Sequence, residues 1–348
     1  MIARPPSDET VTRIGERIDQ LIALDVAARG VIAQLYPWAR AKAPGPLCLS
    51  AAHLLTERVG EGDYVFIATG WPDRPHITPA IAETDGPPGA AALARAVQIG
   101  LKAVPVVLIE PSLVPAMEKV LEATGLRALS PDEARQAVAS TAPIHGGAVL
   151  PFPVDREAAK RHARDLLDRY APKAAVAIEK GGMNDRGFVH TSRGDETTEH
   201  MAKVDYLFQE ATARNIATIG IGDGGNEIGM GLIEAEIRAH LPYGAAGKDP
   251  EKGGMAPSTR TDLLVAASIS NWGSYGVAAC LALLLGRADV FHDRRIEARL
   301  HRVGADVSFI DGITGFVDPG ADGLATDIHE AFVTLMRETL LQGLTRGR

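Results

Sequence analysis

The 348-residue sequence predicts an α/β fold: a doubly wound, mainly parallel sheet with an N-terminal helical segment. Three observations support this prediction. Short apolar runs rich in β-branched residues alternate with stretches of helical periodicity, which is the pattern of βαβ crossovers. The first 60 residues show helical periodicity without such runs. The composition, 46% hydrophobic and 23% charged, is that of a globular protein long enough to bury a large core.

The N-terminal segment, residues 1–60, is expected to pack on the core as helices. Val11, Ile14 and Ile18 recur at helical spacing, and Gly30 is expected to end this stretch. A second helical stretch covers residues 45–59. The remainder, residues 61–348, is expected to form one compact α/β catalytic unit.

Five buried strands are expected in that unit, separated by helices of ordinary length. The predicted strands are 63–69, 104–109, 174–178, 216–221 and 263–269. The predicted helices are 89–100, 113–124, 155–170, 199–214, 226–240 and 273–286, with a further helix starting at Ser130 and a closing helix from about residue 321. Residues 180–198 and 242–260 are expected to be long loops, which are often functional.

Composition excludes several classes of protein and partner. Cys48 and Cys280 are far apart, which excludes a disulfide framework and a cysteine-based zinc site. The net charge of −8, without a Lys/Arg run, argues against nucleic acid as a partner. The longest apolar run, 277–285, is about half of a membrane span, and the N-terminus lacks the apolar part of a signal peptide. A cytoplasmic protein without a membrane partner is expected, and a homo-oligomer is left open.

Acidic residues follow the predicted strands at the edge where open parallel sheets bind ligands. Glu83 and Asp85 follow the first strand, Glu110 the second, Glu179 the third and Asp223 the fourth. Clustered carboxylates repel one another unless they are protonated or neutralised. A divalent metal, Mg²⁺ or Mn²⁺, would neutralise them, since such ions prefer oxygen ligands. The alternative is that each acid caps the next helix or pairs with a surface lysine.

The segment 83–90, ETDGPPGA, runs directly into a predicted helix. Prolines in a first helical turn remove only N–H groups that have no intrahelical partner. The remaining N–H groups and the helix dipole favour an anion, so Gly86 and Gly89 are predicted to contact the substrate. The alternative is a rigid turn with acidic capping.

The segment 220–229, GIGDGGNEIG, contains the spacing G-x-G-x-x-G after a strand, which is the dinucleotide fingerprint. We reject that interpretation because Asp223 would face the pyrophosphate and no acid follows about 20 residues later for the ribose. Asp223 is instead predicted to bind metal, with Asn226 capping the helix and Glu227 in its first turn reaching the same ion. For Glu227 the alternative is a favourable charge near the helix dipole.

Other polar residues near these segments are weaker candidates. Lys180 follows Glu179 and could hold a substrate carboxylate or be a solvated lysine. Asn184 and His190 lie in the long loop, and Asn271 follows the fifth strand. The sequence contains neither a G-x-S-x-G nucleophile elbow nor a Walker A loop.

Four segments, 83–96, 177–190, 218–231 and 270–276, resemble the D-glutamate cyclase C-terminal domain family, formerly a domain of unknown function. The resemblance covers about residues 10–340. It implies an α/β fold and the cyclisation of D-glutamate to 5-oxo-D-proline with loss of water, as in animal members that carry a second domain. Trp71 stands where the family usually has phenylalanine.

The resemblance implies roles for the candidate residues. A metal held by Glu83, Asp85, Asp223 and Glu227 would polarise the carboxylate under attack, and Glu179 would be the general base. The predicted catalytic residues are Glu179, Asp223 and Lys180. The predicted substrate-binding residues are Gly86, Gly89, Asn184, His190, Gly224, Asn226 and Asn271, and Lys180, Asn184 or Asn271 would hold the α-carboxylate.

Three alternatives to the cyclase remain. The first is a Mg²⁺-dependent phosphohydrolase of haloacid-dehalogenase type, although Glu83 stands where that family needs an aspartate nucleophile. The second is a cyclase or lactonising hydro-lyase on another amino or hydroxy dicarboxylate. The third is a non-enzymatic module that binds a small anion, which the acidic cluster opposes because such a module would use Arg and Lys.

Overall fold

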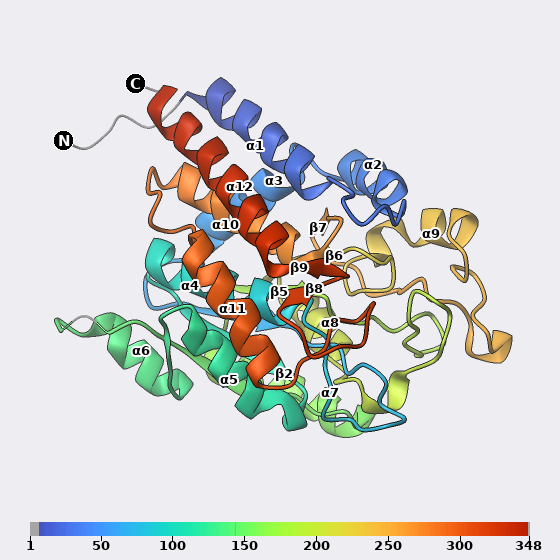
Figure 1. Cartoon of the computed structure of the whole chain (residues 1–348). Helices are drawn as coiled ribbons and strands as arrows, with labels where there is room; N and C mark the ends of the chain where they lie inside the picture. The colour runs from blue at the N-terminus through green and yellow to red at the C-terminus, as the bar shows by residue number, and fades with distance from the viewer. Residues whose placement is uncertain (1–6, 143, 347–348) are drawn as a thin grey trace.

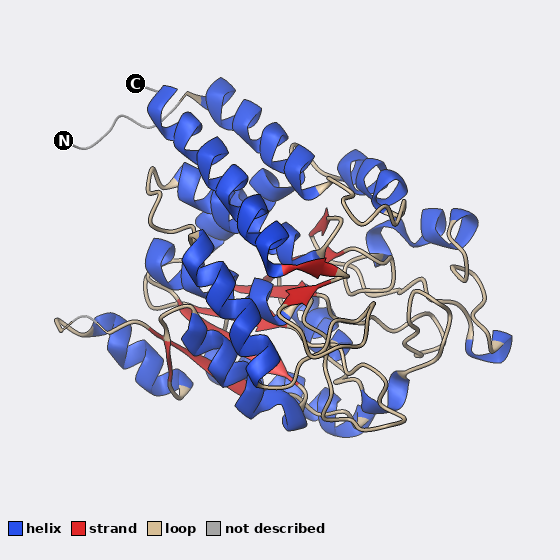
Figure 2. Cartoon of the chain, in the orientation of Figure 1, coloured by secondary structure: helices blue, strands red, loops and turns tan. Residues whose placement is uncertain are grey.

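A computed structural model describes residues 7–142 and 144–346 and shows a parallel seven-stranded sheet with helices on both faces (Figures 1 and 2). The predicted α/β class is confirmed. The strand order is β3-β4-β2-β1-β5-β6-β7. The strands are β1 (Tyr64–Ala68), β2 (Val104–Ile109), β3 (Arg127–Ala128), β4 (Gly146–Pro151), β5 (Ala174–Ile178), β6 (Ala217–Gly222) and β7 (Leu263–Ala266), with a separate hairpin of β8 (Gly320–Ala321) and β9 (Leu324–Ala325).

Helices cover both faces because the central strands are apolar on both sides. In β1, Val65 and Ile67 join one apolar cluster, while Tyr64 and Phe66 join the other. The first cluster is completed by α1 (Asp8–Ile22), α2 (Ile32–Lys42), α3 (Leu47–Arg58), α4 (Pro87–Leu101), α5 (Val114–Ala123), α10 (Ser270–Leu284), α11 (Arg294–Asp306) and α12 (Thr326–Arg346). The second is completed by α6 (Pro131–Ala139), α7 (Arg156–Tyr170) and α8 (Asp205–Ala213). The short α9 (Glu234–His240) follows the loop after β6.

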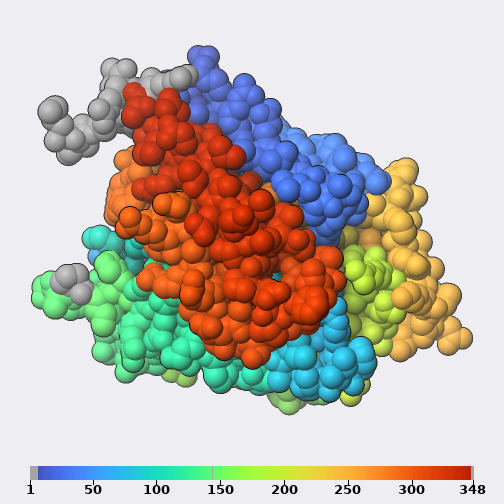
Figure 3. All heavy atoms as spheres, in the orientation of Figure 1, coloured from blue at the N-terminus to red at the C-terminus, as the bar shows by residue number. Residues whose placement is uncertain are grey.

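The two ends of the chain meet on the first face. Helices α1 and α12 lie side by side, and the blue N-terminal and red C-terminal helices adjoin on the surface in Figure 3. The carboxylate of Asp19 in α1 accepts hydrogen bonds from the backbone of Leu47 and Cys48 and from the hydroxyl of Tyr36. This buried carboxylate therefore ties the first three helices together. Within the described residues, no helix has the length and apolar character needed to cross a membrane.

The strand order reverses beside β1, which places the ligand-binding edge. From β1 the chain adds β2 on one side, and β5 later pairs on the other. Open α/β sheets bind ligands at such a point, beyond the carboxyl ends of the strands. The loops 180–198 and 242–260, yellow-green and gold in Figure 1, lie side by side there, and Figure 2 shows the loops gathered on that side.

Several predicted elements differ from the structure. The predicted helix 226–240 begins only at Glu234, because Gly225 and Gly229 have positive φ (91° and 102°) that an α-helix excludes. The predicted helix 199–214 is shorter, at Asp205–Ala213. The structure also contains β4, which the sequence does not predict because Gly146 and Gly147 resemble a turn. A Cβ at Gly146 would lie 2.6 Å from Leu129 Cδ1 and 3.2 Å from the carbonyl oxygen of Arg127, so the neighbouring chain packs closely against this strand. Helix α11, in which six of 13 residues are charged, is also absent from the prediction.

Helices α4 and α10 begin beside one another and cap each other reciprocally. Oδ1 of Asn271, in α10, accepts hydrogen bonds from the backbone N–H of Gly86 (3.0 Å) and Gly89 (2.7 Å) at the start of α4. In return Asp85 accepts from the backbone N–H of Ser270 (2.9 Å) and Asn271 (2.8 Å). Each helix therefore supplies partners for N–H groups that the other leaves open.

This contact requires glycine at position 89. A Cβ there would lie 2.8 Å from Asn271 Oδ1 and 2.9 Å from Asn271 Cα, so Gly89→Ala should reduce the free energy of unfolding by about 1–3 kcal/mol. Gly304→Ala in α11 is the control, since its Cβ would meet only Thr84 Cγ2, at 3.9 Å. This substitution should raise the free energy of unfolding by about 0.5–1 kcal/mol. Urea unfolding measures both, and equal effects would contradict the close-approach argument.

Candidate active site

Three buried carboxylates meet at the edge where the strand order reverses. Asp85 precedes α4, Glu179 directly follows β5, and Asp223 directly follows β6. One oxygen from each lies within 4.8 Å of the others. The parallel strands thus bring together three acids that are up to 138 positions apart in the chain, as the sequence predicts for Asp85 and Asp223.

The positions of Asp85 and Glu179 are fixed by the start of α10. Asp85 caps that helix, and Oγ of Ser270 donates a 2.5 Å hydrogen bond to Oε2 of Glu179. Glu179 has a left-handed backbone (φ 45°), which is uncommon for a residue other than glycine. Gly86 is needed beside it, because a Cβ there would lie 2.9 Å from Glu179 Cβ. Gly86, Gly89 and Asn271, predicted to contact the substrate, instead form the contact between α4 and α10 that holds the carboxylates in place.

The position of Asp223 is fixed by Glu227. The two oxygens of the fully buried Glu227 accept hydrogen bonds from four consecutive backbone N–H groups, those of residues 223–226, at 2.6–3.0 Å. Asn226 and Glu227 lie in the loop before α9, so the predicted capping of a helix by Asn226 is wrong. The structure places Glu227 beneath the loop, where it shapes the backbone that carries Asp223.

Two residues that sequence reasoning missed complete the cluster. Nη1 of Arg29, between α1 and α2, lies 2.8 Å from Oδ2 of Asp223 and 2.5 Å from Oδ2 of Asp322, in the turn of the β8–β9 hairpin. Neither Arg29 nor Asp322 belongs to a recognisable motif, and Asp322 lies 293 positions after Arg29. No local sequence pattern could have identified the pair.

The cluster opens into a pocket of about 630 Å³. Its buried lining is acidic and includes Glu179, Asp223 and Asp322, with the partly buried Glu83 beside them. Of the other predicted residues, Gly224 and Asn226 also line the pocket, whereas Asp85 lies behind the lining. More exposed basic residues lie at the rim. They are Arg74, His76, Arg193 and His200.

Burial and mutual repulsion raise the pKa values of these acids. Burial, followed by the charge of Asp223, raises the pKa of Asp85 to about 7, and the same two causes raise the pKa of Glu227 to about 7. Burial, followed by neighbouring carboxylates, raises the pKa values of Glu83, Glu179 and Asp322 well above their usual range. A cation that prefers oxygen ligands fits this set of donors, because its positive charge would balance the negative charge of the buried carboxylates.

Lys180 lies next to the site but is engaged elsewhere. Its fully buried ammonium donates to the carbonyl oxygen of Gly70 (2.8 Å) and forms an ion pair with Glu110, which also accepts from the backbone N–H of Ala202 (2.8 Å). Lys180 is not part of the pocket lining. The acid after β2 is thus paired within the protein rather than directed to the cluster.

Asn184 and His190 lie outside the pocket lining and help to shape the loops. Nδ2 of Asn184 donates to the carbonyl oxygens of Lys252 (2.9 Å) and Gly254 (2.8 Å), which joins the two long loops. The carbonyl of His190 accepts from Nδ2 of Asn226 (2.9 Å). The ring of His190 is buried, and within the described residues neither ring nitrogen has a hydrogen-bond partner.

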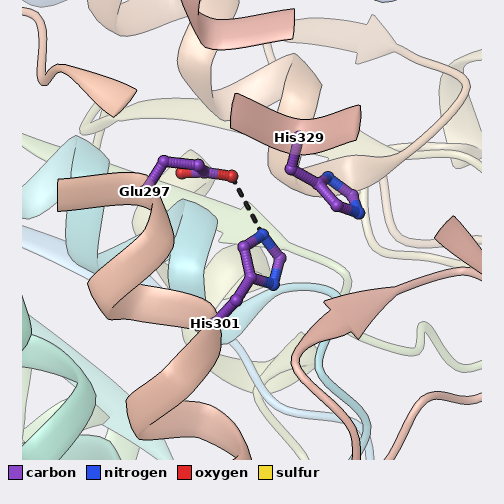
Figure 4. Close-up of side chains that lie close together, drawn as sticks. All are labelled: Glu297, His301 and His329. Carbon is purple, nitrogen blue, oxygen red and sulfur yellow. Dashed lines mark hydrogen bonds and ion pairs between the residues drawn. The ribbon is translucent and has the colours of Figure 1, made fainter. Parts of the chain in front are cut away.

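A second buried cluster, Glu297, His301 and His329, also places three ligand atoms within 4.8 Å (Figure 4). Glu297 accepts hydrogen bonds from Nε2 of His301 (2.9 Å) and of His292 (3.0 Å). Nδ1 of His329 lies 3.0 Å from Nε1 of Trp272, which can only donate, so the proton of His329 is on Nε2.

The N–H of His329 connects this second cluster to the hairpin that carries Asp322. Nε2 of His329 lies 3.3 Å from the carbonyl oxygens of Ala321 and Leu324, on either side of Asp322. With both nitrogens of His329 engaged, we assign this cluster to positioning the hairpin rather than to binding a metal.

The fold and the pocket together define the class: an α/β protein with a buried carboxylate site at the switch point of a parallel sheet, able to hold a cation and a small ligand. The chain belongs to the family described as "D-glutamate cyclase-like, C-terminal", whose sequence model matches residues 18–337. The resemblance that the motifs indicate is thereby confirmed.

The chain is also similar to human "D-glutamate cyclase, mitochondrial", with 32% identity over 227 residues. That match covers 63% of this chain and 33% of the human protein, so it spans about a third of the relative's length.

The raised pKa values predict how stability depends on pH. A carboxyl whose pKa is raised by folding stabilises the protein while it is protonated, and that stabilisation is lost as pH rises through the folded-state value, about 7 for Asp85 and Glu227. In EDTA, the Tm should therefore fall as pH rises from about 4, the ordinary carboxyl range, to about 7, and level off above that. Added Mn²⁺ should raise the Tm more at the upper end of this range.

Thermal melts with EDTA and with Mn²⁺ at several pH values measure this dependence. In Asp223→Asn the slope in EDTA should be smaller, because the charge of Asp223 contributes to both raised pKa values. A Tm that rises with pH over this range in EDTA would contradict the electrostatic account.

Proposed function

We propose that this chain is an enzyme, a hydro-lyase that cyclises D-glutamate to 5-oxo-D-proline with loss of water, reversibly and with the help of a divalent metal. The observation that carries the proposal is the convergence of Asp85, Glu179 and Asp223 beside the pocket, in a chain that belongs to the D-glutamate cyclase-like family. Substrates of this class have two carboxylates and one amine, so they need both cationic and acidic groups in one pocket.

The metal would be held by Asp85 and Asp223, with Glu83 beside them. Carboxylate oxygens suit Mg²⁺ or Mn²⁺, and the raised pKa values of Asp85 and Glu83 reflect a site short of positive charge. When bound, the divalent cation supplies stabilisation for the negative charge on the carboxylate under attack.

Glu179 is suited to accept the proton of the substrate's ammonium group. Burial and the neighbouring acids raise its pKa well above the usual range, which brings its basicity closer to that of an amine. The hydroxyl of Ser270 holds its carboxyl against the start of α10. A fixed, desolvated base of this kind is what deprotonation near neutral pH requires.

Ring closure also depends on positioning. The amine nitrogen attacks the distal carboxylate carbon of the same molecule, so the pocket gains the rate advantage of an intramolecular reaction. The nitrogen loses two protons in all, and the carboxylate oxygen that departs gains both and leaves as water. The loop 223–226, fixed by Glu227, and the cap at Asp85 keep the acidic groups in place during this exchange.

The reaction is tested by incubating the protein with D- and L-glutamate and with both 5-oxoprolines, with Mn²⁺ or with EDTA, and separating the products by chiral chromatography. Conversion of the D-isomers alone, dependent on Mn²⁺, is the expected result. Turnover of a hydroxy dicarboxylate instead would indicate lactone formation. Phosphate release from a phosphoester panel without glutamate turnover would indicate the haloacid-dehalogenase type of chemistry.

Asp223→Asn should lower kcat by about 100-fold or more, because it removes a charge at the point where the transition state is stabilised. Asp168→Asn is the matched control, since Asp168 is an exposed aspartate on α7 that pairs with Arg214, and its kcat should be unchanged. Circular dichroism establishes that both variants fold, and Mn²⁺ binding is measured in each. Unchanged activity and metal binding in Asp223→Asn would remove Asp223 from the mechanism.

A further inference from the structure

Arg29 touches the acidic cluster with only one of its three nitrogens. Nη1 makes both ion pairs, to Asp223 and to Asp322. Within residues 7–142 and 144–346, Nε and Nη2 have no hydrogen-bond partner, and the side chain, 25% exposed, lines the pocket. The open pair, Nε and Nη2, is one edge of the guanidinium, whose two parallel N–H bonds match the two oxygens of a carboxylate.

The backbone around Arg29 is built to hold it in place. The carboxylate of Asp25 accepts hydrogen bonds from the backbone N–H of Arg29 (2.9 Å) and of Gly30 (2.6 Å). Ala28 and Gly30 have positive φ (54° and 77°), so the chain turns tightly on both sides of Arg29. This turn delivers the guanidinium from the N-terminal segment to the edge of the sheet.

The other basic groups near the cluster are less suited to a ligand carboxylate. Lys180 is committed to Glu110, and Arg74 is paired with Asp73. Arg193 is exposed at the rim of the pocket. Arg29 alone among these four contacts Asp223, which places its open edge next to the carboxylates that would hold the metal.

We propose that Arg29 binds the α-carboxylate of the substrate through Nε and Nη2, which makes the N-terminal segment part of the active site and selects dicarboxylates. The inference deepens the proposed function and rests on it. One carboxylate of the substrate lies at the acidic cluster with its metal, and the other lies on the open edge of Arg29. Nη1 keeps its ion pairs with Asp322 and Asp223 meanwhile, so one guanidinium binds both the protein's carboxylates and the ligand's.

The test uses ligands that cannot react: glutarate, with two carboxylates, and butyrate, with one. Calorimetric titration of the Mn²⁺-loaded protein should show that the wild type binds glutarate more tightly than butyrate. Arg29→Gln should weaken glutarate binding about 10- to 100-fold and leave butyrate binding nearly unchanged, so the preference disappears. Arg29→Lys should recover only a small part of it, since an ammonium keeps the charge but lacks the planar edge.

Arg193→Gln is the matched control and should keep the preference for glutarate. Circular dichroism and Mn²⁺ titration of each variant separate a lost contact from a damaged site, because Arg29→Lys should bind Mn²⁺ like the wild type. The inference is overturned if wild type shows no preference for glutarate, or if Arg29→Gln retains it, or if Arg193→Gln abolishes it.

D-Glutamate turnover is measured on the same samples. A preference for glutarate that depends on Arg29, together with no conversion of glutamate, would support the inference while rejecting the proposed reaction. Conversion of D-glutamate that does not depend on Arg29 would support the proposed reaction and reject the role of Arg29.

Discussion

The electrostatic cost of burying several carboxylates at one edge of the sheet is the constraint on which the rest of the structure depends. Asp85, Glu179 and Asp223 lie close together because parallel strands all end at that edge. Each is held by donors from another element, and the guanidinium of Arg29 offsets part of their repulsion. Those buried charges also make the site receptive to a cation, so the same repulsion links stability, metal binding and the proposed chemistry.

Much of this site follows from local sequence and a general rule of topology. Acids directly after apolar β-branched runs are visible in the sequence, and the rule for parallel sheets brings them to one edge. The same rule could not distinguish Glu110, which pairs with Lys180 instead. The strand-forming runs themselves were found where their residues are apolar. The sequence does not predict β4, which begins with two glycines, because these glycines allow close packing against neighbours that no local pattern reveals.

The contributions of Glu227, Arg29 and Asp322 depend on contacts that no local pattern encodes. The segment GNEIG predicts a helix start that includes Glu227, yet positive φ at Gly225 and Gly229 keeps this stretch in a loop. Arg29 lies between α1 and α2 and Asp322 lies in the β8–β9 hairpin, so only tertiary packing brings them together. The sequence therefore indicates the acids that face the ligand far better than the groups that position them.

The separation of Arg29 and Asp322 has a consequence for biosynthesis. These two residues are 293 positions apart, and His329 and Trp272 anchor the hairpin that carries Asp322. During translation the strands and most helices leave the ribosome before that hairpin does. The strands of a nascent chain are therefore available for pairing before the segment that completes its acidic centre has been made.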